Sequence, residues 1–225
     1  MTRLHSSRID LSSSDVIDAL QFALLTEYLS AEFYSRGLNA VGLIPSGDRR
    51  VISTISAHES AHLGAVRQLL VAAGGAAQSK PDFDFTAHGA LPGFAFLPDQ
   101  YDMFLVIAQI IEDTSVRAYK GHLAHLMVDK ATLTAALAIH SAEARHACAI
   151  RRIRGCKGWI TANSRDDLPG FAQATYDGED NPTQRGVNVL AVATALVGST
   201  NATESFDEPL TLPQAAAILA HFLAG

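Results

Sequence analysis

The stretch SAHESAH at residues 56–62 and the stretch HSAEARHA at residues 140–147 each place a glutamate three residues before a histidine. Residues three apart lie on the same face of a helix, so each glutamate and its histidine can point toward one place. These pairs are Glu59 with His62 and Glu143 with His146. Both lie in long segments whose apolar residues recur at helical spacing. The two pairs therefore predict a polar site between packed helices.

Two solitary glutamates extend the pattern. Glu27 lies in ALLTEYLSAEFY at residues 23–34 and Glu112 in IAQIIEDTS at residues 107–115, both on apolar helix faces. A carboxylate is rarely buried without a partner, because removing it from water costs on the order of several kcal/mol. Four glutamate charges cancel two dications, and two imidazoles complete the ligand set. We therefore predict two divalent metal ions, iron or manganese, bound by six residues: Glu27, Glu59, His62, Glu112, Glu143 and His146.

The alternative interpretation is four partly exposed glutamates on amphipathic helices, which need no metal. Their positions favour the metal interpretation, since each lies roughly thirteen residues from the expected start of its helix. All four are therefore expected in one layer of a bundle, whichever way each helix runs. In that layer Glu59 and Glu143 are expected to bridge the two ions, with one histidine on each ion.

Two tyrosines lie on the same helix faces as the solitary glutamates. Tyr34 follows Glu27 by seven residues and Tyr119 follows Glu112 by seven, which is two helical turns. They are either hydrogen-bond donors to ligand carboxylates, with a possible part in redox chemistry, or ordinary core tyrosines. The sequence leaves both interpretations open.

Three further polar residues lie close to the predicted ligands. His140 lies one turn before Glu143. It is either an additional ligand, a hydrogen-bond donor to a ligand or, more simply, a core histidine. Gln109 stands in the same relation to Glu112 and is a candidate to orient it. Glu32 is expected to pair with Arg36 on the surface rather than to bind metal. We interpret His58, His122, His125 and His221 as structural or surface residues.

Four long helices are expected, over residues 14–38, 46–73, 98–126 and 130–154, the first capped by Ser13 or Ser14 and the second by Ser46. Short loops within the first and last pairs predict antiparallel neighbours, and the long connection over 74–98 can cross the bundle lengthwise. The apolar run 187–197 is interpreted as a further helix, and a capping box at Thr211–Gln214 predicts a last helix over 215–223. We expect a bundle over residues 1–157 and an extension over 158–225 packed on it.

The composition fits a helical globular protein and argues against two classes of partner. The chain is 48% hydrophobic and 18% charged, with a net charge of −6 and no basic run longer than Arg151-Arg152, so nucleic acid and anionic membrane are not expected. No stretch of 18 apolar residues and no apolar signal segment near the start is present. With only Cys148 and Cys156, we expect reduced thiols and a cytoplasmic setting, and a homodimer is plausible.

Four segments resemble the ferritin-like superfamily and, more narrowly, its desiccation-related proteins. These are FALLTEYLSAEFYSRGL at 22–38, SAEARHACAIR at 141–151, YDGEDNPTQRGVNV at 176–189 and SFDEPLT at 205–211. The resemblance covers nearly the whole chain, and the last two segments are the discriminating ones. It implies an all-α ferritin-like four-helix bundle with a long crossover and a partly helical C-terminal extension.

The predicted function follows from the predicted metal pair. Two redox-active ions suit an oxidoreductase that acts on a small oxidant, dioxygen or hydrogen peroxide, in protection against stress or desiccation. The alternative is a non-catalytic structural protector whose metal site is vestigial or purely structural. A mineral-storing cage is disfavoured, because the long segment after the fourth helix is bulky and nothing indicates such an assembly.

Overall fold

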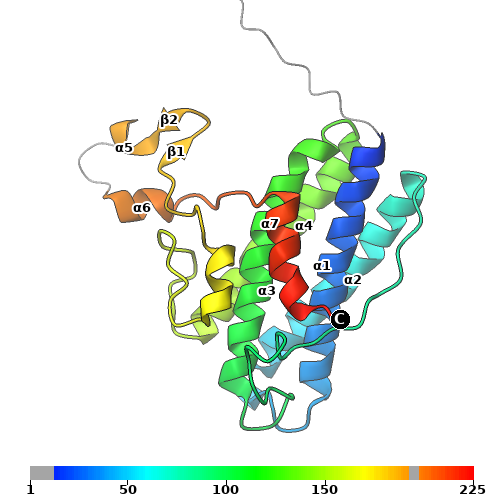
Figure 1. Cartoon of the computed structure of the whole chain (residues 1–225), viewed down its shortest axis with the longest axis vertical. Coiled ribbons are helices and arrows are strands. Elements are labelled where there is room, and N and C mark those ends of the chain that lie inside the picture. The colour runs from blue at the N-terminus through cyan, green and yellow to red at the C-terminus, as the bar shows by residue number, and fades with distance from the viewer. Residues whose placement is uncertain (1–12, 193–197) are drawn as a thin grey trace, which may run out of the picture.

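A bundle of four long helices forms the main body of the computed structural model, which describes residues 13–192 and 198–225 (Figure 1). The helices are α1 (Ser13–Asn39), α2 (Ser46–Ala72), α3 (Tyr101–His122) and α4 (Lys130–Ile153). α1 packs against α2 and α3 against α4, each pair joined by a short loop and antiparallel. Segment 73–100 returns along the bundle, so α2 and α3 run in the same direction. The predicted all-α bundle is confirmed.

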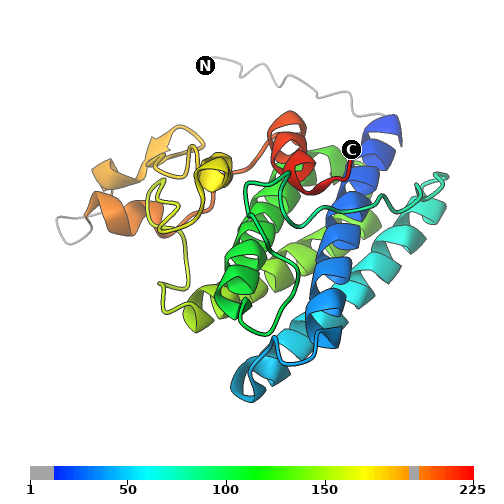
Figure 2. The same ribbon diagram turned by 60° about the horizontal axis from the view of Figure 1, so that its bottom comes forward.

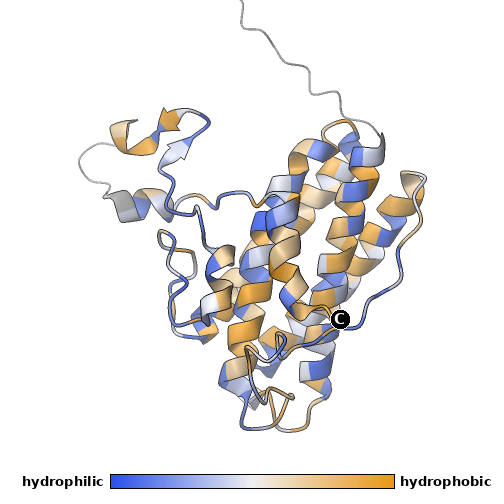
Figure 3. Cartoon of the chain, in the orientation of Figure 1, coloured by the Kyte–Doolittle hydropathy of each residue, from blue (hydrophilic) through white to orange (hydrophobic). Residues whose placement is uncertain are grey.

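The bundle is held together by an apolar core to which α2 and α4 contribute one face each, whereas α3 is buried on all sides over residues 107–119. Figure 3 shows polar and apolar residues interleaved along all four long helices. Phe33, Ile52, Phe104 and Ile107 are completely buried. Burying an aromatic or branched aliphatic side chain stabilises a fold by about 1.5–3 kcal/mol relative to leaving it in water. Packing of these faces, more than helix propensity, therefore fixes the bundle and the layer that contains the glutamates.

The C-terminal end of α2 is closed by two glycines. Gly74 adopts φ +79°, a left-handed conformation that glycine tolerates. Its N–H donates to the carbonyl of Val71 at 3.0 Å, and the N–H of Gly75 donates to Leu70 at 2.8 Å. These two bonds satisfy carbonyls that the helix end would leave free, in the Schellman arrangement.

Two of the predicted helix caps are wrong. Pro45, not Ser46, occupies the N-cap position of α2, and its carbonyl accepts from Asp48 and Arg49 at 3.1 and 3.0 Å. Ser46 therefore lies within the first turn, and α1 likewise begins at Ser13, so that neither Ser13 nor Ser14 precedes its helix. A proline needs no N–H partner, which suits it to a helix start.

α3 is shorter than predicted at both ends. Its N-cap residue is Gln100, whose side chain holds the preceding loop by accepting from the N–H groups of Ala95 and Leu97 at 2.8 and 3.1 Å. This loop occupies the residues near Pro98 that the sequence assigned to the helix. At the other end α3 stops at His122 and a short 3₁₀ segment, η1 (Leu123–Leu126), follows.

The segment after α4 contains short elements only. They are η2 (Gly170–Thr175), β1 (Thr183–Gln184), β2 (Val187–Asn188), α5 (Val189–Val192), α6 (Ser199–Thr203), α7 (Leu212–Leu219) and η3 (Ala220–Phe222). The helix predicted over 187–197 is wrong at its start, because residues 187–188 pair with 183–184 in an antiparallel hairpin. Arg185 and Gly186 have positive φ angles of 50° and 84°, the conformation of a tight hairpin turn. Residues 193–197 lie outside the described residues.

The last helix covers one side of the bundle, and the hairpin projects away from it (Figure 2). α7 begins at Leu212, earlier than predicted, after Thr211, whose N–H donates to Gln214 Oε1 at 2.9 Å as a capping box requires. α7 packs on α3. The end of the chain is tied to the crossover, since Ala224 N–H donates to the carbonyl of Asp82 at 2.9 Å. The domain boundary at 157/158 stays a prediction.

Over the described ranges, none of the helices combines the length and the apolar character that crossing a membrane requires.

Candidate metal centre

Six side chains from the four bundle helices converge in the centre of the bundle. They form two groups whose possible ligand atoms all lie within 4.8 Å of one another. One group contains Glu27, Glu59, His62 and Glu143, and the other contains Glu59, Glu112, Glu143 and His146. The structure therefore brings together all six residues predicted as metal ligands, with Glu59 and Glu143 common to both groups. Among the described residues these are the clusters with metal-binding composition.

Each histidine presents Nδ1 to three carboxylates. His62 Nδ1 lies 2.8 Å from Glu143, 3.7 Å from Glu27 and 3.9 Å from Glu59. His146 Nδ1 lies 2.7 Å from Glu59, 3.6 Å from Glu112 and 3.8 Å from Glu143. The contacts of His62 and those of His146 are arranged symmetrically about Glu59 and Glu143, which take part in both. If each group held one ion, each ion would have one imidazole and one carboxylate of its own, with Glu59 and Glu143 common to both.

The buried polar atoms of this cluster lack hydrogen bonds, although they lie close together. Both oxygens of Glu59 and Glu143, one oxygen each of Glu27 and Glu112, and both Nδ1 atoms have no hydrogen-bond partner. Leaving a buried charged group without a partner costs on the order of several kcal/mol. Eight such atoms facing one space are the donors that two cations need, and carboxylate oxygen with imidazole nitrogen suits iron, manganese or zinc. The residues present thus fit a dinuclear metal site.

Tyr34 and Tyr119 each donate a hydrogen bond to a glutamate of this cluster. Tyr34 binds Glu112 and Tyr119 binds Glu27, in each case across the bundle rather than to the glutamate on the same helix. Both hydroxyls are buried, and burial raises the pKa of each tyrosine well above its ordinary value. Each bond uses the glutamate oxygen that faces away from the metal positions and so orients the other oxygen toward them.

Without metal the cluster retains protons. Burial, together with the charges of neighbouring glutamates, raises the pKa of Glu27 and Glu112 well above the ordinary value. Burial lowers the pKa of His62, but its close approach to the Glu143 and Glu59 carboxylates outweighs burial and raises this pKa to about 9. Burial raises the pKa of Glu143, but His146 and His62 outweigh it and lower this pKa to about 2. Protons therefore occupy positions that two dications would take.

Three of the neighbouring candidates lie outside the cluster. Gln109 donates to the Tyr176 hydroxyl at 3.3 Å and accepts from Arg154, so the prediction that it orients Glu112 is wrong. His140 belongs to neither group, and burial lowers its pKa. Glu32 pairs with Arg36 at 3.7 Å, as predicted, and also with Lys80.

One residue near the cluster was missed in the sequence analysis. His58, interpreted above as structural or surface, lies with its Nδ1 3.0 Å from Nε2 of His146, and the two rings stack at 5.2 Å. Burial and the nearby His146 lower its pKa. Its position four residues before His62 was the available signal, because residues four apart share a helix face.

A buried ion pair fixes α3 beside the cluster. Arg151 on α4 binds both oxygens of Asp113, the residue after Glu112, at 2.7–3.1 Å. The Tyr176 hydroxyl from the C-terminal segment donates to the same carboxylate at 2.7 Å. Arg117, one turn further along α3, pairs with Glu179 at 2.6 Å. The C-terminal segment thus holds the helix that carries Glu112.

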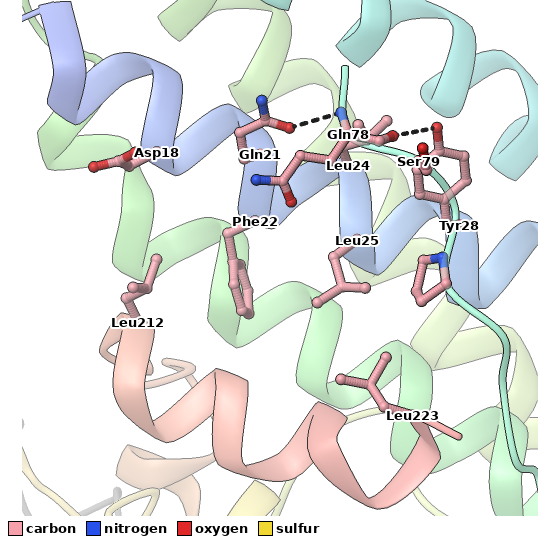
Figure 4. A pocket seen from close by; sticks show the side chains of 11 residues that line it. Asp18, Gln21, Phe22, Leu24, Leu25, Tyr28, Gln78, Ser79, Leu212 and Leu223 are labelled. Carbon is pink, nitrogen blue, oxygen red and sulfur yellow. Dashed lines mark hydrogen bonds between the residues drawn. The ribbon is translucent and has the colours of Figure 1, made fainter. Parts of the chain in front are cut away.

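A cavity of about 460 Å³ lies outside the cluster, between α1, the crossover and the C-terminal helix (Figure 4). It is mainly apolar, with Phe22, Leu25 and Leu223 on its walls. Some of its polar groups are paired, since the backbone N–H of Gln78 donates to Gln21 at 3.3 Å and its carbonyl accepts from the Tyr28 hydroxyl at 3.1 Å. None of the six converging residues lines it.

A comparison with protein families agrees with the fold. A family model described as a ferritin-like domain matches residues 15–155, which contain α1 from Asp15 onward, all of α2, α3 and α4, and all six converging residues. The chain therefore belongs to the ferritin-like family. No curated protein matches it.

Proposed function

We propose that this protein is a dinuclear iron or manganese oxidoreductase that acts on dioxygen or hydrogen peroxide. The observation that carries the proposal is the set of eight buried oxygen and nitrogen atoms that face one another without hydrogen bonds. A pair of redox-active ions held there would supply two electrons to dioxygen or hydrogen peroxide, or accept two from hydrogen peroxide. Four carboxylates balance the charge of two dications and can adjust as the ions change oxidation state.

The surroundings support a small substrate. The six residues are buried except for His62, whose side chain is 12% exposed. Around them the outer faces of α2 and α4 are open, since Ala61, Ala144 and Arg145 are exposed. α7 packs on α3. A diatomic or peroxide molecule approaching from solvent would meet His62 first, because its side chain is the most exposed of the six.

The two tyrosines position two of the glutamates in the proposed site. Tyr34 and Tyr119 each hold a phenolic hydrogen against a candidate ligand carboxylate in a dry environment. A raised phenol pKa keeps that proton on the oxygen at neutral pH. Their role is to hold Glu112 and Glu27 in place, and the resemblance to desiccation-related proteins suggests a setting of stress protection.

The test is an assay of purified protein loaded with iron or manganese. Peroxide decay and Fe(II) oxidation are measured for the natural chain and for a Glu59→Ala, Glu143→Ala variant. The proposal predicts that the variant loses both activities, because it removes the two carboxylates common to both groups. A Glu32→Ala variant is the matched control, since that glutamate lies on α1 outside the cluster. Equal rates for the natural chain and the double variant contradict the proposal and favour a non-catalytic protector.

A further inference from the structure

The two candidate metal positions differ in how their histidines are held from outside. His146 has its outer nitrogen, Nε2, 3.0 Å from Nδ1 of His58, and the two rings are nearly parallel, 23° apart. His62 has no such support: within the described ranges, no residue makes a hydrogen bond to its outer nitrogen. His146 is also the less exposed of the pair, with 5% of its side chain exposed against 12% for His62.

The chemistry of a metal-bound imidazole fixes the direction of this hydrogen bond. His146 directs Nδ1 toward Glu59, Glu112 and Glu143, so Nδ1 must be free of a proton when a cation lies there. The ring proton is then on Nε2, which donates to Nδ1 of His58. A partner of this kind selects the tautomer, restrains the ring and raises the basicity of the ligating nitrogen.

We infer that His58 is a positioning residue that makes the two metal positions inequivalent, with the His146 position binding the first ion and the His62 position binding the second more weakly. The inference rests on the proposed function, since it concerns ions bound by the same six residues. It goes beyond that function by assigning an order of filling. It also assigns the exchangeable ion to the His62 position, which lies nearer to solvent.

His58 lies at the surface of α2, so its substitution can be made without opening the core. His58→Phe keeps a ring to stack on His146 and removes the acceptor. His58→Asn restores an acceptor, because Oδ1 of asparagine occupies nearly the position of Nδ1 of histidine along the side chain. His125→Phe is the matched control, since His125 is an exposed histidine that belongs to neither cluster.

The experiment is a titration of metal-free protein with Co(II), followed by visible absorption and calorimetry, without any assay of activity. The natural chain is expected to bind two ions in two resolved steps. His58→Phe is expected to weaken the first step by about 10–100-fold, the usual effect of losing such a partner. His58→Asn is expected to recover most of this loss, and His125→Phe to titrate like the natural chain.

The order of filling has its own variants. Glu27→Gln is expected to remove the weaker step and leave the tighter one, whereas Glu112→Gln removes the tighter step. The opposite assignment, or a first step that is unchanged in His58→Phe, overturns the inference while leaving the dinuclear site intact. A natural chain that binds no Co(II) overturns the proposed function as well, so the two failures are distinguishable.

Discussion

Metal binding is expected to stabilise this fold strongly, because both candidate positions exist only when the four helices are packed. A ligand at a free concentration 100-fold above its Kd stabilises the folded state by about 2.7 kcal/mol per site. Two sites therefore contribute about 5 kcal/mol. In a chain of 225 residues, 1 kcal/mol moves the melting temperature by about 2–4 °C, so the expected rise is about 10–20 °C.

The assay is thermal unfolding followed by circular dichroism, with Mn(II) or with a chelator. The Glu59→Gln, Glu143→Gln variant is expected to lose the metal-dependent rise, measured against its own melting temperature in chelator, since glutamine keeps the size of the side chain but not its charge. Glu32→Gln is the control and is expected to keep the rise. A natural chain that melts at one temperature in both conditions refutes the reasoning, as does a double variant that keeps the full shift.

Three further outcomes follow from the structure. Loading with metal is expected to release protons at pH 7, including the proton of His62, and calorimetry in buffers of different ionisation enthalpy measures this release. The metal-free chain is expected to lose stability as pH rises from about 6.5 through about 9, because folding raises the pKa of His62 and the residue gives up its proton over this range. Urea melts across pH measure this loss, and the absence of both effects would contradict the reasoning. Arg151→Met is expected to cost about 3–5 kcal/mol in urea unfolding by leaving the buried Asp113 carboxylate without its ion-pair partner, and an unchanged midpoint contradicts this. Gly37→Ala places a methyl group 2.3 Å from the Phe104 ring and is expected to cost about 1–3 kcal/mol, which an unaltered melting temperature would exclude.

The sequence predicted the convergence of the six residues because two local signals agree. A glutamate on an apolar helix face is unfavourable without a partner, and four at equal depth in four helices point to a common one. The helix bounds were close for α4, where Asp129 caps the first turn through Ala131 and Thr132 at 2.9 and 3.3 Å. Apolar periodicity and turn residues carry this kind of information.

Contacts between helices were not predictable in the same way. Tyr34 reaches Glu112 and not Glu27, because two turns of a helix separate residues by about 10 Å along the axis while a packed neighbour is closer. Gln109 was assigned to Glu112 by spacing, but its amide is engaged by Tyr176 and Arg154 from the segment after the bundle. These hydrogen-bond partners depend on which helices and segments pack together, and the residue pattern of a single helix does not contain that information.

The hairpin at β1 and β2 was missed for a different reason. The apolar run from residue 187 was interpreted as a helix because of its hydrophobicity, whereas the turn residues before it determine the local structure. Arg185-Gly186 reverses the chain with two positive φ angles, and Thr183 pairs with Asn188 across it. A glycine at that turn was the available signal.

Anomalous scattering at the iron and manganese edges from a crystal of protein grown with either metal tests the central claim most directly. Two peaks per chain are expected inside the bundle, both beside Glu59 and Glu143. One would lie next to Glu27 and His62, and the other next to Glu112 and His146. A crystal with no peak among these side chains, or with metal bound elsewhere on the chain, would contradict the account.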